Sequence, residues 1–120
     1  MTGRLTTHVL DTAQGRPAAN MEIELWRLGA GNGGRTLVKS VRTNAGGRTD
    51  ELLLAGDELQ ADTYELVFMV GDYFAGQGIV TPTPRFLDRV PVRFGISDPN
   101  AHYHVPLLTS PWSYSTYRGS

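Results

Sequence analysis

The chain has 120 residues, the usual size of a single domain built around one hydrophobic core. Hydrophobic residues make up 40% and charged residues 19%, and a formal net charge of −1 gives no attraction for nucleic acid or acidic lipid. The sequence contains no cysteine, which excludes disulfides, thiol nucleophiles and cysteine zinc sites. We therefore predict one domain over residues 1–120 with no nucleic-acid partner.

Short apolar runs separated by turn residues dominate the first half of the chain. Across the whole sequence, fourteen glycines and seven prolines interrupt these runs, and no run keeps helical spacing over three turns. This pattern predicts an all-β sandwich. We expect strands at Leu5–Leu10, Met21–Leu28 and Thr36–Thr43, with a turn at Gln14–Pro17 and a glycine-rich loop over residues 29–34.

The second half of the chain predicts further strands and one short helix. A turn at Asn44–Gly47 opens it, and the helix is expected between Gly71 and Gly78, with Asp72 near its start. Alternation of apolar and polar residues marks the strands, and the most apolar of them follows Tyr64. The expected strands are Arg48–Glu51, Tyr64–Val70, Val90–Ile96, His102–Leu108 and Ser115–Arg118.

No segment has the composition of a membrane or export signal. Residues Met1–Leu5 lack the apolar stretch of a signal peptide, and the longest apolar run, Leu66–Val70, is far shorter than a membrane span. We therefore expect a soluble, cytoplasmic protein with no membrane partner.

The three histidines are the first candidates for chemistry. All lie in predicted strands, and alternation places His102 and His104 on the same face of theirs. Their ordinary pKa near neutrality suits a general base or acid, or metal ligands. The spacing alone favours a simpler interpretation, polar residues on the solvated face of a sheet. A zinc shell of His8, His102 and His104 is another interpretation, although the spacing does not place His8 beside the other two.

Arg48 and the C-terminal segment are the other candidates. Arg48 follows a glycine-rich turn, from which a guanidinium could offer paired donors to a planar anion, or could simply face solvent. The strand-like Tyr114–Tyr117 indicates that the terminus is tied down. The sequence contains no Gly-x-Ser-x-Gly elbow, phosphate loop or dinucleotide fingerprint.

Three separated segments carry a more specific pattern. They are Leu-Thr-Thr-His-Val-Leu-Asp-Thr at 5–12, Arg-Thr-Asn-Ala-Gly-Gly-Arg-Thr-Asp at 42–50, and the stretch 102–120, which begins His-Tyr-His-Val-Pro and ends Tyr-Arg-Gly-Ser. Together they resemble the transthyretin-like 5-hydroxyisourate hydrolases over essentially the whole chain. The closing Tyr-Arg-Gly-Ser is the most informative, because in this family it separates the hydrolases from the hormone-carrying transthyretins. Gly46 departs from the pattern, in which aspartate more often stands before Gly-Arg.

The resemblance implies a sandwich of two four-stranded sheets, to which the sequence adds one short helix. It also implies a homotetramer with sites at subunit interfaces, and no metal or other cofactor. His104 rather than His102 matches the active-site position of the family. The residues that the resemblance assigns to the site are His8, Arg48, His104, Tyr117, Arg118, Gly119 and Ser120.

The reaction implied is hydrolysis of 5-hydroxyisourate, the product of urate oxidation in purine degradation, to 2-oxo-4-hydroxy-4-carboxy-5-ureidoimidazoline. We expect His104 or His8 to take a proton from the attacking water while Arg48 holds the substrate and stabilises negative charge. Tyr117 would orient the substrate ring. The wall of the substrate site would be completed by Arg118, Gly119 and Ser120. Three alternatives stay open: a binding protein without catalysis, a metal-dependent hydrolase and a structural module.

Overall fold

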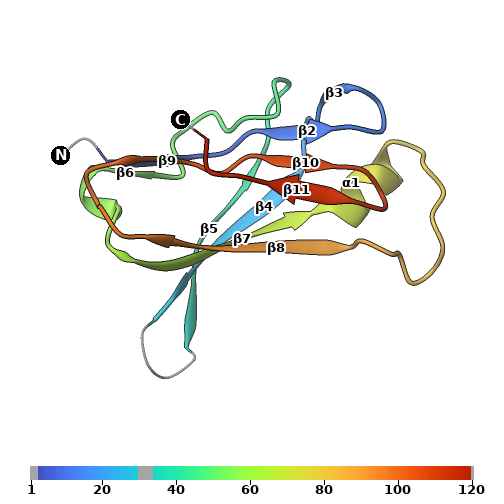
Figure 1. Ribbon diagram of the computed structural model, residues 1–120. Coiled ribbons are helices and arrows are strands. Elements are labelled where there is room, and N and C mark those ends of the chain that lie inside the picture. Colours follow the sequence, from blue (N-terminus) through green and yellow to red (C-terminus); the bar gives the residue numbers. More distant parts are fainter. Residues whose placement is uncertain (1–2, 30–33, 120) are drawn as a thin grey trace.

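Two layers of β-strands face one another in the computed structural model, which describes residues 3–29 and 34–119 (Figure 1). One layer is a four-stranded antiparallel sheet in the order β5-β4-β7-β8. Its strands are β4 (Glu22–Leu28), β5 (Arg35–Arg42), β7 (Asp62–Met69) and β8 (Arg89–Ile96). These strands lie where the alternation predicted them, within one or two residues at each end.

The other layer consists of two smaller sheets joined end to end, in the orders β6-β1-β9 and β11-β10-β2-β3. Each part contains one parallel pair, β1 with β9 in the first and β2 with β10 in the second. The strands of this layer are β1 (Arg4–Thr6), β2 (Val9–Asp11), β3 (Arg16–Pro17), β6 (Leu54–Ala55), β9 (His102–His104), β10 (Leu107–Thr109) and β11 (Tyr114–Thr116). The predicted sandwich is thus confirmed, but its second layer is divided.

The division has a cause in the backbone. The single strands expected at Leu5–Leu10 and His102–Leu108 are each broken near the middle. Pro106 has no N–H to donate to a ladder, and the N–H of Val9 donates to the carbonyl of Gly47 at 2.8 Å instead of to a strand neighbour. The turn before Arg48 is therefore hydrogen-bonded to the chain at the point where β1 has ended and β2 begins.

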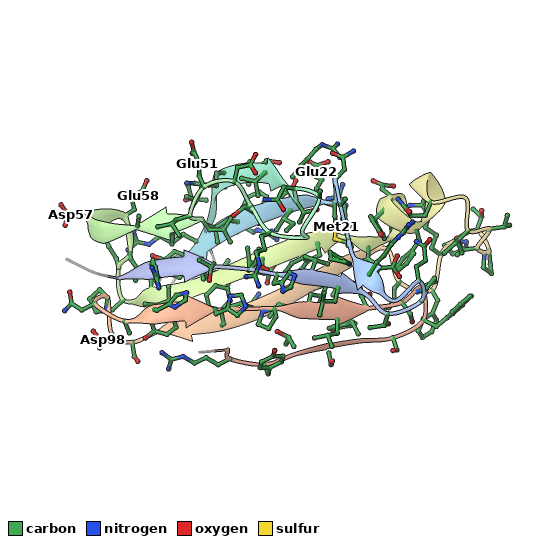
Figure 2. All side chains as sticks on the ribbon, turned by 90° about the horizontal axis from the view of Figure 1, so that it is seen from above. Met21, Glu22, Glu51, Asp57, Glu58 and Asp98 are labelled. Atoms are coloured by element: carbon green, nitrogen blue, oxygen red, sulfur yellow. The ribbon has the colours of Figure 1, made fainter. Side chains whose placement is uncertain are left out.

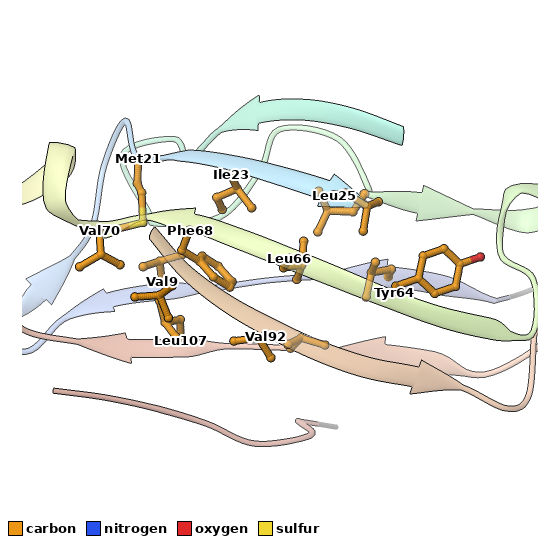
Figure 3. Packing of buried hydrophobic residues seen from close by; sticks show 14 of the residues in the cluster. Val9, Met21, Ile23, Leu25, Tyr64, Leu66, Phe68, Val70, Val92 and Leu107 are labelled. Carbon is orange, nitrogen blue, oxygen red and sulfur yellow. The ribbon is translucent and has the colours of Figure 1, made fainter. Parts of the chain in front are cut away.

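The core lies between the two layers, as the close-up of its side chains shows (Figure 3). Alternation along the strands was predicted correctly, since Leu5, Thr7 and Val9 are buried while Thr6, His8 and Leu10 are half-buried. Thr6 and His8 therefore face outward, whereas Thr7 faces the core. Further members of the core are Met21, Ile23, Leu25, Leu66, Phe68, Val70, Val90, Val92 and Leu107.

One α-helix, α1 (Val70–Gly76), follows β7 and is confirmed at its predicted place; a short 3-10 turn, η1 (Gly56–Glu58), follows β6. The hydroxyl of Tyr73 in α1 donates to the buried carboxylate of Asp11 at 2.8 Å. Burial and this bond raise the pKa of Tyr73 to about 12. The helix is thereby tied to β2. None of the described helices is both long and apolar enough to cross a membrane.

Other expectations about local structure were wrong in detail. No strand forms at Arg48–Glu51, because side chains there bond to nearby backbone groups: the N–H of Arg48 donates to Asn44 Oδ1 and the Thr49 hydroxyl to the Glu51 carbonyl. Residues 16 and 17, expected within a turn, form β3. The last strand ends at residue 116, earlier than predicted. Of the expected loop 29–34, residues 30–33 lie outside the described part of the chain.

Candidate functional site

His8 projects from the link between β1 and β2, on the outward face that it shares with Thr6. Its Nε2–H donates to the carbonyl oxygen of Gly46 at 2.9 Å, so in the neutral ring the lone pair lies on Nδ1. Burial and the positive charge of Arg48 lower the pKa of His8, and the bond to Gly46 partly opposes them. The net lowering of the pKa favours the neutral imidazole of His8.

A rigid turn sets Arg48 beside His8. The side-chain oxygen of Asn44 accepts from the N–H groups of Gly46 and Arg48 at 2.9 and 3.2 Å. Gly47 has a φ of +75°, and a Cβ there would collide with the carbonyl oxygen of Val9, so only glycine fits. Gly46, which departs from the family pattern, has no positive φ and supplies its carbonyl to His8.

His104 comes to the same face because β1 and β9 pair in parallel, with Thr6 opposite His104. The Thr6 hydroxyl lies 2.8 Å from His104 Nδ1 and also 2.8 Å from His102 Nε2, so it bridges the two rings. Burial, followed by the charges of Arg48, His102 and His8, lowers the pKa of His104. Burial and Arg4 likewise lower the pKa of His102.

No carboxylate pairs with the charged and titratable groups of this face in the part of the chain that the structure describes. Within residues 3–29 and 34–119, Arg48 forms no ion pair, and no carboxylate is among the groups that shift the pKa of any histidine. Seen from above, the carboxylates of Glu51, Asp57, Glu58 and Asp98 lie at the periphery of the molecule (Figure 2). An exposed guanidinium beside neutral imidazoles suits a planar ligand that carries or develops negative charge.

The C-terminal segment reaches His104 through Gly119. The N–H of Gly119 donates to the His104 carbonyl at 2.8 Å, and a Cβ on Gly119 would lie 2.5 Å from Cδ2 of the His104 ring. Arg118 instead stacks on the ring of Tyr103, 4.2 Å from its centroid. Tyr103 is buried on the opposite face of β9 from His104, and Arg118 Nη2 also donates to the backbone carbonyl of His102 at 3.5 Å. The guanidinium of Arg118 therefore packs on β9 on the side of the Tyr103 ring and not on that of the His104 ring.

Tyr117 is 59% exposed and, with Arg118, lines a cavity of about 310 Å³ between β8 and the end of the chain. A single chain thus brings together His8, Arg48, His104 and Gly119, whereas Tyr117 and Arg118 lie apart from them. Ser120, the last predicted site residue, lies outside the described residues.

Thr6 is the site residue that the sequence interpretation did not select. Its alternation with His8 placed it on the correct face, but the parallel pairing with His104 could not be read from spacing. The three-histidine metal shell considered above does not form: no cluster of three or more potential metal-binding side chains occurs in the described part of the chain.

Comparison with known proteins identifies the family of the chain. The sequence model of the HIUase/Transthyretin family matches residues 5–119. The chain belongs to this family. A relative in the HIUase/Transthyretin family, the 5-hydroxyisourate hydrolase of Mesorhizobium japonicum, is 61% identical over 98% of this chain and 93% of its own.

Two solved structures extend the comparison within the HIUase/Transthyretin fold. The crystal structure of (S)-allantoin synthase has a TM-score of 0.92 and 50% identity; the match covers 99% of this chain and 44% of that longer one. Sea bream transthyretin, solved in complex with thyroxine, has a TM-score of 0.84 and 30% identity over 97% of this chain and 94% of its own. The fold is therefore shared with proteins of different activity, and the side chains must distinguish among them.

Proposed function

We propose that this chain hydrolyses 5-hydroxyisourate to 2-oxo-4-hydroxy-4-carboxy-5-ureidoimidazoline in urate degradation. One observation carries the proposal: His8 and His104, two imidazoles whose pKa is lowered, share a face with the guanidinium of Arg48, which forms no ion pair with any residue that the structure describes. The name of the Mesorhizobium relative supports the choice of substrate.

The chemistry follows from these groups. Water attacks a ring lactam carbonyl while a neutral imidazole takes its proton, and the carbonyl oxygen becomes an oxyanion. Arg48 binds the substrate and stabilises that oxyanion with its charged N–H donors. The base is served by His8 Nδ1 or by His104 Nε2, since the other nitrogen of each ring is already hydrogen-bonded. A general base typically raises the reaction rate about 10²–10⁴-fold, and one hydrogen-bond donor to the oxyanion raises it about 10²–10³-fold.

A homotetramer with sites between subunits completes the proposal. His8 and His104 are half-buried and Arg48 is exposed, so this face of one subunit encloses a small ligand poorly. Strands β8 and β11 are edges of their sheets, and all three residues of β11 are exposed, which leaves hydrogen-bonding groups free to pair with another copy. Tyr117, Arg118 and Ser120 would then contribute to a site shared between subunits. A fully active monomer in light scattering at assay concentration would contradict this arrangement.

The test of function is direct. Urate oxidase generates 5-hydroxyisourate in the cuvette, and its ultraviolet absorbance is followed with and without the protein. Accelerated decay that survives exhaustive chelation is expected, because the proposal assigns the histidines to water and substrate. Loss of turnover on chelation, restored by zinc, would favour a metal-dependent hydrolase. No acceleration at all would favour a binding protein of the transthyretin kind.

A further inference from the structure

The Thr6 hydroxyl occupies an unusual position between two imidazoles. It lies 2.8 Å from Nδ1 of His104 and 2.8 Å from Nε2 of His102, and the two ring centroids are 6.1 Å apart. A hydroxyl has one proton to donate, whereas a neutral imidazole has one N–H and one lone pair. If the hydroxyl donates to one ring, the other ring must donate to the hydroxyl to keep both bonds. The protonated nitrogen of His102 therefore determines that of His104.

We propose that Thr6 and His102 are positioning residues that hold His104 in the tautomer protonated on Nδ1, with the lone pair on Nε2. In this arrangement His104 Nδ1–H donates to Thr6, and the Thr6 hydroxyl donates to His102 Nε2. The inference rests on the proposed function, because it concerns how His104 acts as a base there. His102 and Thr6 touch neither substrate nor water in this account; they act through His104.

Only this arrangement leaves His104 able to accept a proton. In the opposite arrangement the hydroxyl donates to Nδ1, so Nε2 carries the hydrogen and neither ring nitrogen has a free lone pair. In the proposed arrangement a proton from water forms the Nε2–H bond as the water oxygen attacks, and Nδ1–H keeps its bond to Thr6. The proton then returns from Nε2 to the departing ring nitrogen. The hydroxyl bridge need not rearrange at any step.

The first measurement examines the tautomer without reference to activity. The ¹⁵N chemical shifts of imidazole in the labelled protein, at a pH where His104 is neutral, separate a protonated from an unprotonated nitrogen. We expect Nδ1 protonated and Nε2 unprotonated in the wild type, and loss of this preference in Thr6→Val. Thr7→Val is the matched control, because it removes a neighbouring hydroxyl that donates to the Val105 carbonyl on the opposite face. It should lower stability and leave the His104 spectrum unchanged.

The second measurement tests the coupling to His102 by kinetics. His102→Phe removes the acceptor for the hydroxyl proton, which then turns to His104 Nδ1 and stabilises the inactive tautomer. We expect kcat/KM to fall roughly tenfold or more, within the 10²–10⁴-fold that a general base supplies. In the Thr6→Val background the same substitution should cause no further loss, and Thr6→Ser should retain most of the activity.

Two outcomes would overturn the inference: a wild-type His104 protonated on Nε2, or an equal loss from His102→Phe in both backgrounds. Failure of the proposed function is distinguishable. A wild-type protein that does not accelerate decay of 5-hydroxyisourate would refute the enzymatic proposal, whatever tautomer the spectrum records.

Discussion

The two outward faces of the sandwich differ in whether their charged side chains form ion pairs with carboxylates. On the outer face of β5-β4-β7-β8, Glu65 is only 9% exposed and lies 3.6 Å from Arg35 and 3.3 Å from Arg93. At the end of the same sheet, on the face of Tyr64, Arg27 bonds Asp62 at 2.7 Å. On the face of β1 and β9, the charged and titratable groups have no carboxylate partner in the described part of the chain.

We call the outer face of β5-β4-β7-β8 the paired face and the face of β1 and β9, to which the proposed function assigns the chemistry, the reactive face. The hydrogen bond between Arg27 and Asp62 lowers the pKa of the carboxyl and raises that of the guanidinium, so both charges persist and satisfy each other. On the other face, burial and the positive charge of Arg48 lower the pKa of His8 and His104. Arg48 gains no ion-pair stabilisation from the described residues; under the proposed function, its charge favours two neutral bases and leaves one cation available to a ligand.

The largest effect is expected from removing the positive charge of Arg48. Arg48→Gln should lower kcat/KM about 10²–10³-fold, because the substrate loses a charged donor that strengthens as the oxyanion forms. Stability should change little, since no ion pair of Arg48 exists among the described residues. Initial rates with enzymatically generated 5-hydroxyisourate, together with thermal unfolding, measure both quantities.

Arg93→Gln is the matched control for this substitution, since it removes the same charge from the paired face. It should leave kcat/KM essentially unchanged and alter stability by at most about 1 kcal/mol, as for exposed ion pairs. If the two variants lost activity equally, the distinction between the faces would be wrong.

The next largest effect should come from crowding His104. Gly119→Ala places a Cβ 2.5 Å from the ring, which must then move by a few tenths of an ångström or more. Displacement of a catalytic group by about 1 Å can cost roughly 10²-fold, so kcat/KM should fall toward that magnitude with the fold intact. Circular dichroism and the same kinetic assay measure this. Full activity in Gly119→Ala would show that the end of the chain does not hold His104.

The sequence predicted more of the paired face than of the reactive one, and the reason is physical. The strands of the β5-β4-β7-β8 sheet follow the alternation of apolar and polar residues, which is a local property of the sequence. The positions of β4, β7 and β8 were therefore predicted almost correctly. The reactive face depends on a parallel pair, β1 with β9, whose residues are about one hundred positions apart. Spacing cannot report such a contact. The grouping of His8 with His104 therefore came from family resemblance, and Thr6 was not selected at all.

Acidic pH should lower both the stability of the protein and kcat/KM through the histidines of the reactive face. The pKa values of His8 and His104 are lowered from 6.5, so at a pH just below 6.5 the unfolded chain binds more protons than the native one. Stability should therefore fall as pH drops through this range, and the acid limb of kcat/KM should lie below 6.5. In Arg48→Gln the limb should move upward, because one cause of the lowering is gone. An unmoved limb would mean that the titrating group is not His8 or His104.

The smallest effect is expected on the paired face, from Glu65→Gln. The substitution keeps the shape of the side chain and removes the charge that Arg35 and Arg93 share. Both arginines are largely exposed, so solvent screens the lost attraction, and the free energy of unfolding should fall by about 1 kcal/mol. Added salt should shrink the difference between variant and wild type, because screening weakens the wild-type pairs. Urea denaturation at low and high salt measures it, with hydrolysis followed in parallel. The two layers meet through an apolar core, so activity should be unchanged. A loss of turnover in a protein of unaltered oligomeric state would mean that the charge on one face is coupled to the site on the other.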